Sequence, residues 1–280
     1  MTETISSAGN PVVKRMRLLA DRKHRRKQGA FVVEGIQPVW RAVEAGWAIE
    51  VLITAPELIT NPAVSQLITD QERRGTRVAR LSRELFLRLS ERDGPAGIAA
   101  IVGARSYKLD QLSVTATSVF AALHSVSNPG NLGTVIRTVD AVGGAGVVVI
   151  GDTADEFAPA AVKASMGSVF AIRVARAATE EEFFDWAALH DVCVVATSGA
   201  AEHDHWHAPY RTPLAVLLGN EGEGLPRSAL ERADLQVRIP MVGTAESLNL
   251  AAAAAITLYE ARRNAPDLME DAGRARASLR

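Results

Sequence analysis

The chain has 280 residues, of which 48% are hydrophobic and 22% charged, and this composition excludes wholesale disorder, collagen and coiled-coil arrays. At about 150 residues per domain, the length predicts two domains. Residues 1–30 carry eight basic and two acidic groups, a balance of +6, so the formal net charge of −1 leaves −7 on the rest of the chain. A basic segment on an acidic body indicates a strongly anionic partner such as nucleic acid.

The cysteine and apolar patterns narrow the class of protein. Cys193 is the single cysteine, which excludes an internal disulfide, and its apolar neighbours indicate a buried structural thiol rather than a nucleophile. The sequence contains no run of about 18 apolar residues, so we expect no membrane span. The charged N-terminal segment lacks the apolar core of a secretory signal. We therefore expect a cytoplasmic enzyme or binding protein.

The first elements along the chain predict a small α/β unit. Asn10 and Pro11 are typical of a helix start, and we expect one basic helix from there to Gly29. Short apolar runs then alternate with helical stretches. The expected strands are 31–33, 51–53, 78–81 and 98–102, and the expected helices are 37–45, 63–73 and 84–89. The polar, weakly periodic segment 104–117 follows, and we expect it to be a linker.

The second half of the chain predicts a parallel sheet, because its apolar runs are nearly continuous, as in strands buried on both faces. The expected strands are 119–123, 146–150, 169–174, 192–196, 214–218 and 237–239. The expected helices are 132–142, 159–166, 180–190, 227–233 and a long alanine-rich helix over 246–263. These patterns predict an N-terminal domain over 1–103, a second domain over 118–264 and a frayed tail over 265–280.

Three loops rich in glycine and asparagine follow expected strands, at 127–133, 217–226 and 239–249. Open α/β sheets bind ligands outside the carboxyl ends of their strands, so the three loops predict a ligand site. None of them contains a dinucleotide-binding or P-loop glycine pattern. Backbone donors and acceptors beside apolar residues such as Leu218 and Met241 favour an amphipathic, nucleoside-like ligand.

The segments NPGNLGTVIRTVDAVG, LLGNEGEGL and IPMVGTAESLNLAAAAAITLYEARR resemble, in this order, the three motifs of the SpoU/TrmH family of RNA ribose methyltransferases, in the SPOUT superfamily. The resemblance extends to VKASMGSVF at 162–170 and, weakly, to residues 10–55, which resemble the family's small substrate-binding domain. It implies a C-terminal α/β SPOUT domain with a parallel sheet and a deep trefoil knot, a small N-terminal α/β domain, and a homodimer. The implied reaction transfers a methyl group from S-adenosylmethionine to a ribose 2′-hydroxyl of RNA, with large-subunit ribosomal RNA the favoured substrate.

The resemblance also implies roles for individual residues. Arg137, Asn131, Glu221, Ser247 and Asn249 match the family's catalytic positions. A guanidinium with a pKa above about 12 is a poor base, so we expect Arg137 to clamp a phosphate and the developing alkoxide, and the proton acceptor stays open. Glu221 is expected to be a polar anchor or a proton relay. The expected cofactor contacts are Thr197, Gly219, Asn220, Gly222, Ile239, Met241, Ser247, Leu248 and Asn249.

Structural alternatives stand beside these roles. Arg137 has the alternative of a solvent-exposed helix arginine, Glu221 of a surface charge, and Asn131 and Ser247 of helix caps. Alternative functions are a transfer-RNA methyltransferase, an antibiotic-resistance ribosomal RNA methyltransferase, a non-catalytic RNA-binding assembly factor, and a nucleotide-dependent oxidoreductase. Intact motif residues count against the assembly factor, and the missing glycine fingerprint counts against the oxidoreductase.

Two further charge patterns yield expectations. The dense N-terminal cations suit RNA phosphates, although a solvated helix face is the alternative. The residues expected to contact RNA are Lys14, Arg15, Arg22, Lys23, Arg25, Arg26 and Lys27. The run His203-Asp204-His205-Trp206-His207 suggests a metal site, but no further ligand joins it, so we favour a solvated loop and expect no metal.

Overall fold

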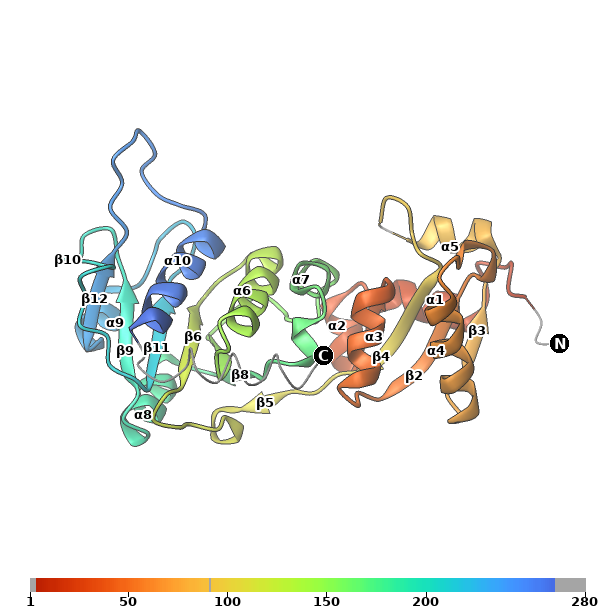
Figure 1. Cartoon of the computed structure of the whole chain (residues 1–280), viewed down its shortest axis with the longest axis horizontal. Helices are drawn as coiled ribbons and strands as arrows, with labels where there is room; N and C mark the ends of the chain where they lie inside the picture. The colour runs from red at the N-terminus through yellow and green to blue at the C-terminus, as the bar shows by residue number, and fades with distance from the viewer. Residues whose placement is uncertain (1–3, 91, 265–280) are drawn as a thin grey trace. The chain divides into compact units, whose positions relative to one another are not determined.

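The computed structural model describes residues 4–90 and 92–264 (Figure 1). Residue contacts divide the chain into two compact units. Unit 1 contains the chain up to residue 105 together with residues 155–171, and unit 2 contains residues 106–154 and the chain from residue 172. Residues 155–171, which the sequence patterns placed in the second domain, thus group with the N-terminal part. The expected tail, 265–280, lies outside the described residues.

Unit 1 contains a four-stranded sheet in the order β1-β4-β2-β3. β4 is antiparallel to both its neighbours, and β2 and β3 are parallel. The strands are β1 (Ala30–Glu34), β2 (Ile49–Thr54), β3 (Val78–Arg80) and β4 (Ile98–Gly103). The helices are α1 (Pro11–Leu18), α2 (Arg22–Gln28), α3 (Ile36–Glu44), α4 (Pro62–Arg73), α5 (Arg83–Leu89) and α7 (Pro159–Ser165), with short 3₁₀ turns η1 (Pro56–Leu58) and η3 (Ser168–Phe170).

The core of unit 1 explains why residues 155–171 belong to it. Phe157 and Phe170 pack with Phe31 and Trp47 in an aromatic cluster, with ring centroids 4.5 to 6.2 Å apart. The Trp47 indole donates a hydrogen bond to the Phe170 carbonyl at 3.2 Å. Phe31 itself is fully buried, so residues 155–171 complete the core around it.

The expected basic helix over 11–29 is two helices. Asp21 is extended (φ −90°, ψ 134°), and its carboxylate accepts from the backbone amides of Lys23 and His24 at 2.8 and 3.3 Å. This cap starts α2 and ends any continuation of α1, since aspartate competes for backbone groups at such positions. Gly29 ends α2 in the left-handed region (φ 58°), as the sequence predicts.

Unit 2 contains an all-parallel sheet in the order β10-β12-β9-β11-β6-β7-β8-β5. This confirms the predicted parallel α/β architecture. The strands are β5 (Tyr107–Lys108), β6 (Val119–His124), β7 (Gly146–Ile150), β8 (Val174–Ala177), β9 (Cys193–Thr197), β10 (His203–Asp204), β11 (Leu214–Leu218) and β12 (Leu235–Arg238). The helices are α6 (Pro129–Ala141), α8 (Glu180–Leu189), α9 (Arg227–Arg232) and α10 (Leu250–Arg263), with the 3₁₀ turn η2 (Leu109–Gln111).

Helices cover both faces of this sheet, which is why its strands are apolar on both sides. On one face, α6 and α10 pack together and bury Leu132, Ile136 and Leu258. On the other, α8 and α9 bury Phe183 and Ala229. The loop 239–249, between β12 and α10, projects from unit 2 (Figure 1).

Three expected elements differ in the structure. The strand expected over 169–174 was wrong: Val169 and Phe170 are buried in the core of unit 1 within η3, and β8 begins only at Val174. The segment 104–117, expected to be a linker, contains β5 and η2. The last helix begins at Leu250 rather than residue 246, because Asn249 caps it. No helix in the described part of the chain is long and apolar enough to cross a membrane.

Candidate functional site

A cavity of about 700 Å³ lies at the carboxyl ends of β9, β11 and β12. Its walls come from residues 197–199, from the loop after β11 and from the loop 239–249. The second and third of the three loops singled out in the sequence are therefore brought together. All nine expected cofactor residues line the cavity, namely Thr197, Gly219, Asn220, Gly222, Ile239, Met241, Ser247, Leu248 and Asn249. Their contact with a ligand stays a prediction.

The loop after β11 is a closed turn that needs glycine. Asn220 and Gly224 exchange two backbone hydrogen bonds, at 3.0 and 2.9 Å. The backbone of Gly224 comes so close to Gly219 that a Cβ on Gly219 would lie 2.2 Å from the Gly224 carbonyl carbon. The Asn220 side chain holds the turn in place, accepting from the Gly222 amide at 2.8 Å and donating to the Ser125 carbonyl at 2.9 Å. Backbone groups of the turn are thus fixed along the cavity wall.

A side-chain network joins all three loops. The Asn131 amide donates to Glu221 Oε1 at 3.0 Å, and Asn249 donates to Asn131 Oδ1 at 3.1 Å. The backbone amides of Ser127 and Asn128 also donate to the Glu221 carboxylate, at 3.4 and 3.3 Å. Asn131, Glu221 and Asn249, three of the five expected catalytic residues, therefore form one connected group.

The charge state of Glu221 follows from this network. Partial burial raises the pKa of its carboxyl, but the hydrogen bonds from Asn131 and from the backbone amides of Ser127 and Asn128 outweigh that effect. The net pKa lies below the ordinary glutamate value, because each bond stabilises the carboxylate. Glu221 is therefore ionised at neutral pH. A carboxylate held in this way is a weak base, which favours the anchor role over the relay.

The other two expected catalytic residues lie apart from this network. Arg137 is exposed on α6 and does not line the cavity. Six residues separate it from Asn131, which places their side chains on faces of the helix about 120° apart. Ser247 lines the cavity and is exposed. The helix-cap alternatives for Asn131 and Ser247 are wrong, because Asn128 caps α6 and Asn249 caps α10.

Carboxylates dominate the charge of the cavity wall. Glu221, Glu223 and Glu246 line it, and Arg238 is the single cation among its lining residues. The Arg238 guanidinium is paired with Asp204 at 2.7 Å. Sequence reasoning missed Glu223 and Glu246, although both lie inside the motif segments. The negative charge of both side chains could have indicated them, since an acidic wall suits a positively charged ligand.

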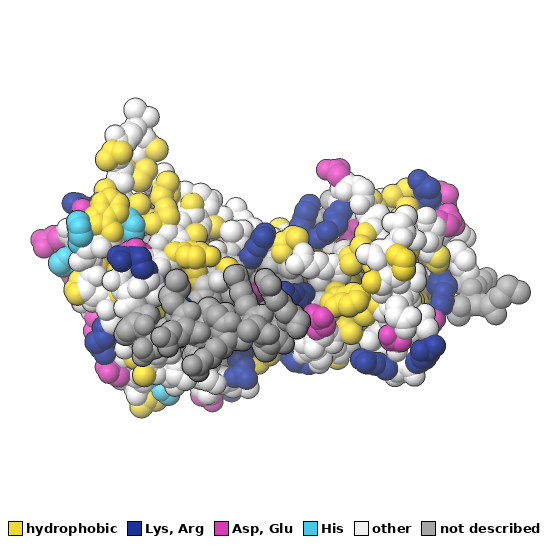
Figure 2. All heavy atoms as spheres, viewed as in Figure 1, with side chains coloured by type: hydrophobic (Ala, Val, Ile, Leu, Met, Phe, Trp, Pro, Cys, Tyr) yellow, Lys and Arg dark blue, Asp and Glu magenta, His cyan; other side chains and the backbone are white. Residues whose placement is uncertain are grey.

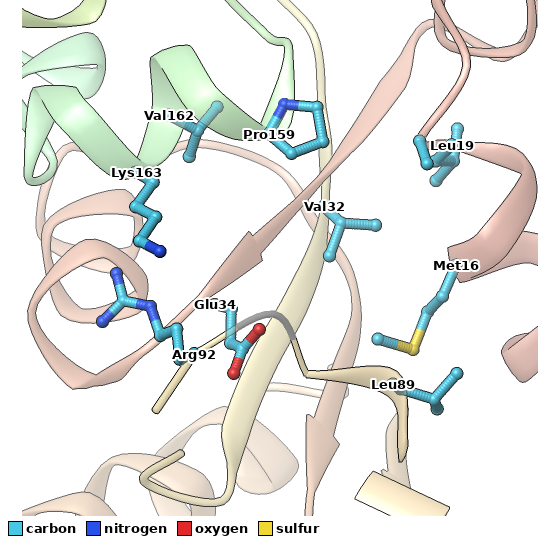
Figure 3. A pocket seen from close by; sticks show the side chains of 10 residues that line it. Met16, Leu19, Val32, Glu34, Leu89, Arg92, Pro159, Val162 and Lys163 are labelled. Atoms are coloured by element: carbon cyan, nitrogen blue, oxygen red, sulfur yellow. The ribbon is translucent and has the colours of Figure 1, made fainter. Parts of the chain in front are cut away.

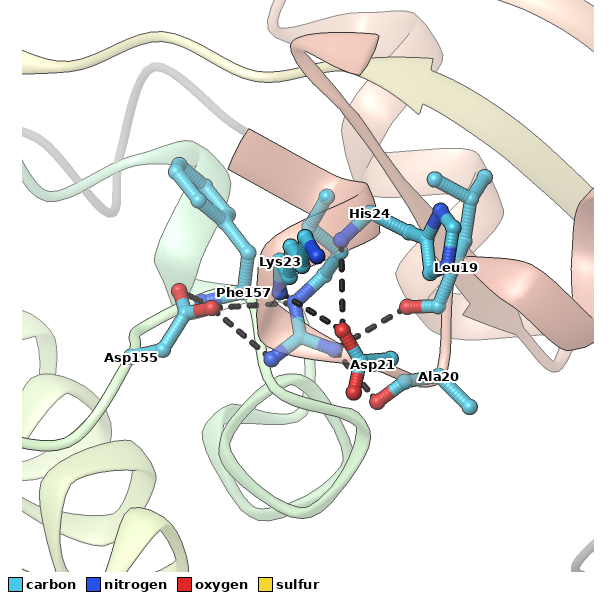
Figure 4. A network of polar contacts seen from close by, with 8 residues as sticks. Leu19, Ala20, Asp21, Lys23, His24, Asp155 and Phe157 are labelled. Atoms are coloured by element: carbon cyan, nitrogen blue, oxygen red, sulfur yellow. Dashed lines mark hydrogen bonds and ion pairs between the residues drawn. The ribbon is translucent and has the colours of Figure 1, made fainter. Parts of the chain in front are cut away.

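The expectation that Arg25 contacts RNA is wrong, because its side chain is buried and paired within unit 1. It is 5% exposed, and its guanidinium donates to Asp155 at 2.8 and 2.9 Å and to the carbonyls of Leu19 and Ala20 at 3.0 and 2.6 Å (Figure 4). It therefore holds residues 155–171 to the helices of unit 1. Sequence spacing could not separate it from its neighbours, because the partner lies 130 positions away.

The remaining cations of this segment differ in accessibility. Arg15 is half-buried and pairs with Glu50 at 2.5 Å, and Arg22 is also half-buried. Four others are exposed, namely Lys14, Lys23, Arg26 and Lys27. Their contact with RNA stays a prediction.

The histidine run does not converge on one point. His203 and His207 are exposed, whereas His205 is 7% exposed and packs on Trp206. Within residues 4–90 and 92–264, no group of three or more His, Cys, Asp or Glu side chains is placed to hold a metal ion.

Exposed apolar side chains gather on the loop 239–249 and on α10. Figure 2 shows hydrophobic side chains along the projecting loop. They are Met241, Val242 and Leu248 on the loop and, on α10, Tyr259 at 56% and Ile256 at 37%. α10 packs against α6, so this apolar surface belongs to the helix pair that also presents Arg137.

Two family models match the chain. The model of the SpoU rRNA Methylase family matches residues 118–259, and the model of the MRM3-like substrate binding domain matches residues 10–100. The first match contains the loop after β11 and α10 up to Tyr259, and the second contains the sheet of unit 1 up to Ala100 in β4.

Named relatives match over nearly their whole length. A 23S rRNA uridine 2′-O-methyltransferase of Streptomyces viridochromogenes is 32% identical, over 88% of this chain and 87% of the relative. A 23S rRNA guanosine 2′-O-methyltransferase of Bacillus subtilis is 34% identical, over 92% of this chain and 98% of the relative.

Solved structures share the fold. The crystal structure of an AdoMet-bound rRNA methyltransferase from Sinorhizobium meliloti is 38% identical and covers 93% of this chain and 97% of its own, with a TM-score of 0.85. The SpoU methyltransferase AviRb from Streptomyces viridochromogenes, in complex with AdoMet, is 30% identical and covers 91% of this chain and 98% of its own, with a TM-score of 0.82.

Proposed function

The chain belongs to the SpoU rRNA methylase family, and from this premise we propose that it methylates a ribose 2′-hydroxyl of large-subunit ribosomal RNA. It is an S-adenosylmethionine-dependent RNA 2′-O-methyltransferase. Membership also implies the deep trefoil knot of the family. The observation that carries the proposal is the cavity at the carboxyl ends of β9, β11 and β12, lined by the second and third motif loops, to which Asn131 of the first loop is hydrogen-bonded.

The cavity suits S-adenosylmethionine chemically. Leu218, Ile239, Met241 and Leu248 offer apolar contacts for an adenine ring, and the fixed backbone of the β11 turn offers hydrogen-bond donors and acceptors. The three carboxylates of its wall suit a cation. When bound there, S-adenosylmethionine would supply a methyl group on a positively charged sulfur.

We assign distinct roles to the motif residues. Glu221, held as a carboxylate by Asn131 and two backbone amides, anchors the loops in the geometry that aligns the reacting groups. Ser247 and Asn249 position substrate and cofactor at the cavity. Arg137 clamps an RNA phosphate and the alkoxide that develops at the attacked ribose, because a guanidinium stabilises negative charge but does not take up a proton.

We propose that the working unit is a homodimer. The exposed apolar residues of α10 and of the loop 239–249 support this, since a self-complementary apolar surface is typical of such interfaces. Arg137 is exposed on α6, which packs against α10, and it does not line its own cavity, so we assign its action to the cavity of the partner copy. The substitution Tyr259→Glu is expected to yield a monomer by light scattering and to abolish methylation. A fully active monomeric variant would contradict this part of the proposal.

RNA binding is assigned to unit 1, which matches a substrate-binding model and carries the exposed cations of α1 and α2. Such cations supply phosphate affinity that does not depend on base sequence. We further propose that the protein needs no metal and that it works in the cytoplasm, where ribosomal RNA is assembled.

The test uses the purified full chain, labelled S-adenosylmethionine and, separately, ribosomal RNA and transfer RNA that lack modifications. Nuclease digestion of the product is expected to release a 2′-O-methylated nucleotide from large-subunit RNA. If only transfer RNA is labelled, the substrate is transfer RNA and not ribosomal RNA. Binding of RNA without binding of S-adenosylmethionine by calorimetry would point to a non-catalytic assembly factor.

The catalytic role of Arg137 has a separate test in the same assay. Arg137→Ala is expected to lower methylation by about 10²-fold or more, as for the loss of a group that stabilises developing charge. It should leave the affinity for S-adenosylmethionine unchanged, because the role assigned to Arg137 is toward the RNA phosphate and the alkoxide and not toward the cofactor. Arg227→Ala, which removes another exposed arginine of unit 2, is the matched control. Equal activity of the two variants would refute the role.

A further inference from the structure

Unit 1 contains a second, smaller pocket, of about 110 Å³ (Figure 3). Allowing about 10–15 Å³ for each water-sized atom, it has room for on the order of ten atoms, which is the size of one nucleobase. Its walls come from α1 and the residues after it, from β1, from the end of α5 and from α7. The lining residues are Met16, Leu19, Ala20, Val32, Glu34, Leu89, Arg92, Pro159, Val162 and Lys163.

One side of this pocket is apolar and the other is cationic. Met16, Leu19 and Leu89 form the apolar side, and Lys163 and Arg92 point toward one another across from them (Figure 3). Among the described residues, no acidic side chain forms an ion pair with either cation. Two facing cations that are not held in ion pairs favour binding of an anion between them.

Contacts with Gly35 and Ser90 position the groups on the cationic side of the pocket. A Cβ on Gly35 would lie 2.7 Å from Arg92 Nη1, so the guanidinium packs directly on a residue that has no side chain. Gly35 has a φ of 105°, which also requires glycine. The Ser90 hydroxyl donates to the Glu34 carboxylate and accepts from the Arg92 amide at 3.1 Å. Glu34 therefore keeps a fixed acceptor at the pocket, suited to an N–H group on the edge of a base.

The pocket adjoins the basic segment of the chain. Met16 lies on α1, which also carries the exposed cations Lys14 and Arg17, and α2 follows with Lys23, Arg26 and Lys27. An RNA strand whose phosphates lie on these helices would pass the pocket mouth. An apolar slot beside a phosphate path is the arrangement by which proteins hold single-stranded bases.

We propose that this pocket holds one unstacked nucleobase of the bound RNA, with a neighbouring phosphate between Lys163 and Arg92. The proposal rests on the RNA substrate proposed above, and it places a point of substrate selection in unit 1, in addition to the methyl-transfer cavity of unit 2. Structured RNA is thus recognised where a base is already out of its stack, since unstacking a paired base costs free energy.

The first test fills the pocket. Ala20 is exposed and lines it, and its carbonyl, which accepts from Arg25, remains when the side chain changes. Ala20→Phe is expected to weaken binding of a fluorescent single-stranded RNA decamer roughly fivefold or more, which is the lower range for one lost stacked base. Binding of the matching RNA duplex should stay unchanged, as should the melting temperature. Equal affinity of wild type and variant for the single strand would overturn the proposal.

The second test removes the cations. The double variant Lys163→Ala/Arg92→Ala is expected to weaken single-strand binding and to lower the slope of log affinity against log salt by about one, as for one lost phosphate contact. Ala20→Phe should leave this slope unchanged. Arg74→Ala, which removes an exposed cation directly after α4 and outside the pocket, is the matched control and should change neither quantity. An unchanged slope in the double variant would refute the phosphate site.

Two further measurements separate the possible outcomes. The first measures binding of guanosine monophosphate at millimolar concentration. If the nucleotide binds wild type but not Ala20→Phe while both bind RNA equally, the pocket is a site for free nucleotides and the RNA assignment is overturned. In methylation assays, Ala20→Phe is expected to raise the KM for RNA and to keep kcat. A wild-type protein without methyl transfer would refute the proposed function, whereas an active wild type with an unchanged KM in Ala20→Phe would refute only the pocket.

Discussion

At the scale of single residues, the amide of Asn249 performs two tasks at once. Its Oδ1 accepts from the Ala251 amide at 2.9 Å and caps α10, while its Nδ2 donates to Asn131. Asn131 in turn donates to a carboxylate, which can only accept, so the orientation of both amides is determined. The two tasks can therefore be separated by changing the donor alone.

Asn249→Asp makes that separation. Aspartate caps helices about as well as asparagine, so the free energy of unfolding should change by less than about 1 kcal/mol. The donor to Asn131 is lost, and a second carboxylate faces the network around Glu221. We expect methylation to fall at least tenfold, about the effect of 1.4 kcal/mol. Asn249→Ala, which loses both cap and donor, should lower the melting temperature as well as the activity.

The lowered pKa of Glu221 predicts how cofactor affinity depends on pH. A depressed pKa means that the carboxylate network is complete above the ordinary glutamate range, near pH 4.3, and is lost as the pH falls through the lowered value. As long as the protein stays folded, its affinity for S-adenosylmethionine should therefore be constant from neutral pH to below about pH 4.3, and it should fall at lower pH. Calorimetry across this range checks the expectation. Glu221→Gln should bind more weakly at neutral pH and lose the acid-dependent fall, and a fall that persists in this variant would assign it to another group.

At the scale of elements, the β11 turn depends on one close backbone approach. Gly219→Ala would bring its Cβ to 2.2 Å from Gly224, so the turn must open. We expect this variant to lose S-adenosylmethionine binding by at least tenfold while the strands of unit 2 stay folded, as measured by calorimetry and circular dichroism. Gly222→Ala is the matched control, since the nearest atom to its Cβ is the Asn220 oxygen at 3.5 Å. Its affinity should stay close to that of wild type.

Elements with strong local signals could be predicted from the sequence. The apolar runs of β6, β7 and β11 were placed to within a residue, because strands buried on both faces have a continuous pattern. Residues 169–174 have the same pattern but pack into the core of unit 1, a tertiary effect that no local signal carries. The break at Asp21 was missed because the cap competes with a basic run that otherwise favours helix.

The candidate site divides in the same way. The three motif loops could be located from glycine and asparagine content, since ligands bind at strand ends. The hydrogen bonds that join Asn131, Glu221 and Asn249 span about a hundred positions, so only the fold shows them. The burial of Arg25 was invisible for the same reason, because Asp155 lies in a separate segment.

At the scale of the molecule, the Arg25–Asp155 pair holds residues 155–171 to unit 1. Both side chains are at most 10% exposed, so removal of one leaves a buried charge without a partner. Arg25→Ala is expected to destabilise the protein by about 3 kcal/mol or more, measured by denaturant unfolding with tryptophan fluorescence. Lys27→Ala, an exposed cation of the same helix, should stay within about 0.5 kcal/mol of wild type.

A double variant shows whether this loss comes from the pair itself. Arg25→Ala/Asp155→Ala should be less destabilised than the sum of the two single variants, because the second change removes the unpaired carboxylate. Strict additivity would mean that the two side chains contribute independently and that the bonds of Arg25 to the carbonyls of Leu19 and Ala20 account for its effect.

Because residues 155–171 belong to unit 1, this unit is not formed by one continuous stretch of the chain. The chain passes between the units three times, near residues 105, 154 and 171. A fragment cut after residue 105 would lack Phe157, Val162, Val169 and Phe170, and would leave the side of its core around Phe31 bare to water. Unit 1 therefore cannot be separated from the rest of the chain by a single cut. To exchange unit 1 between relatives, both the stretch up to residue 105 and the stretch 155–171 must be transferred together.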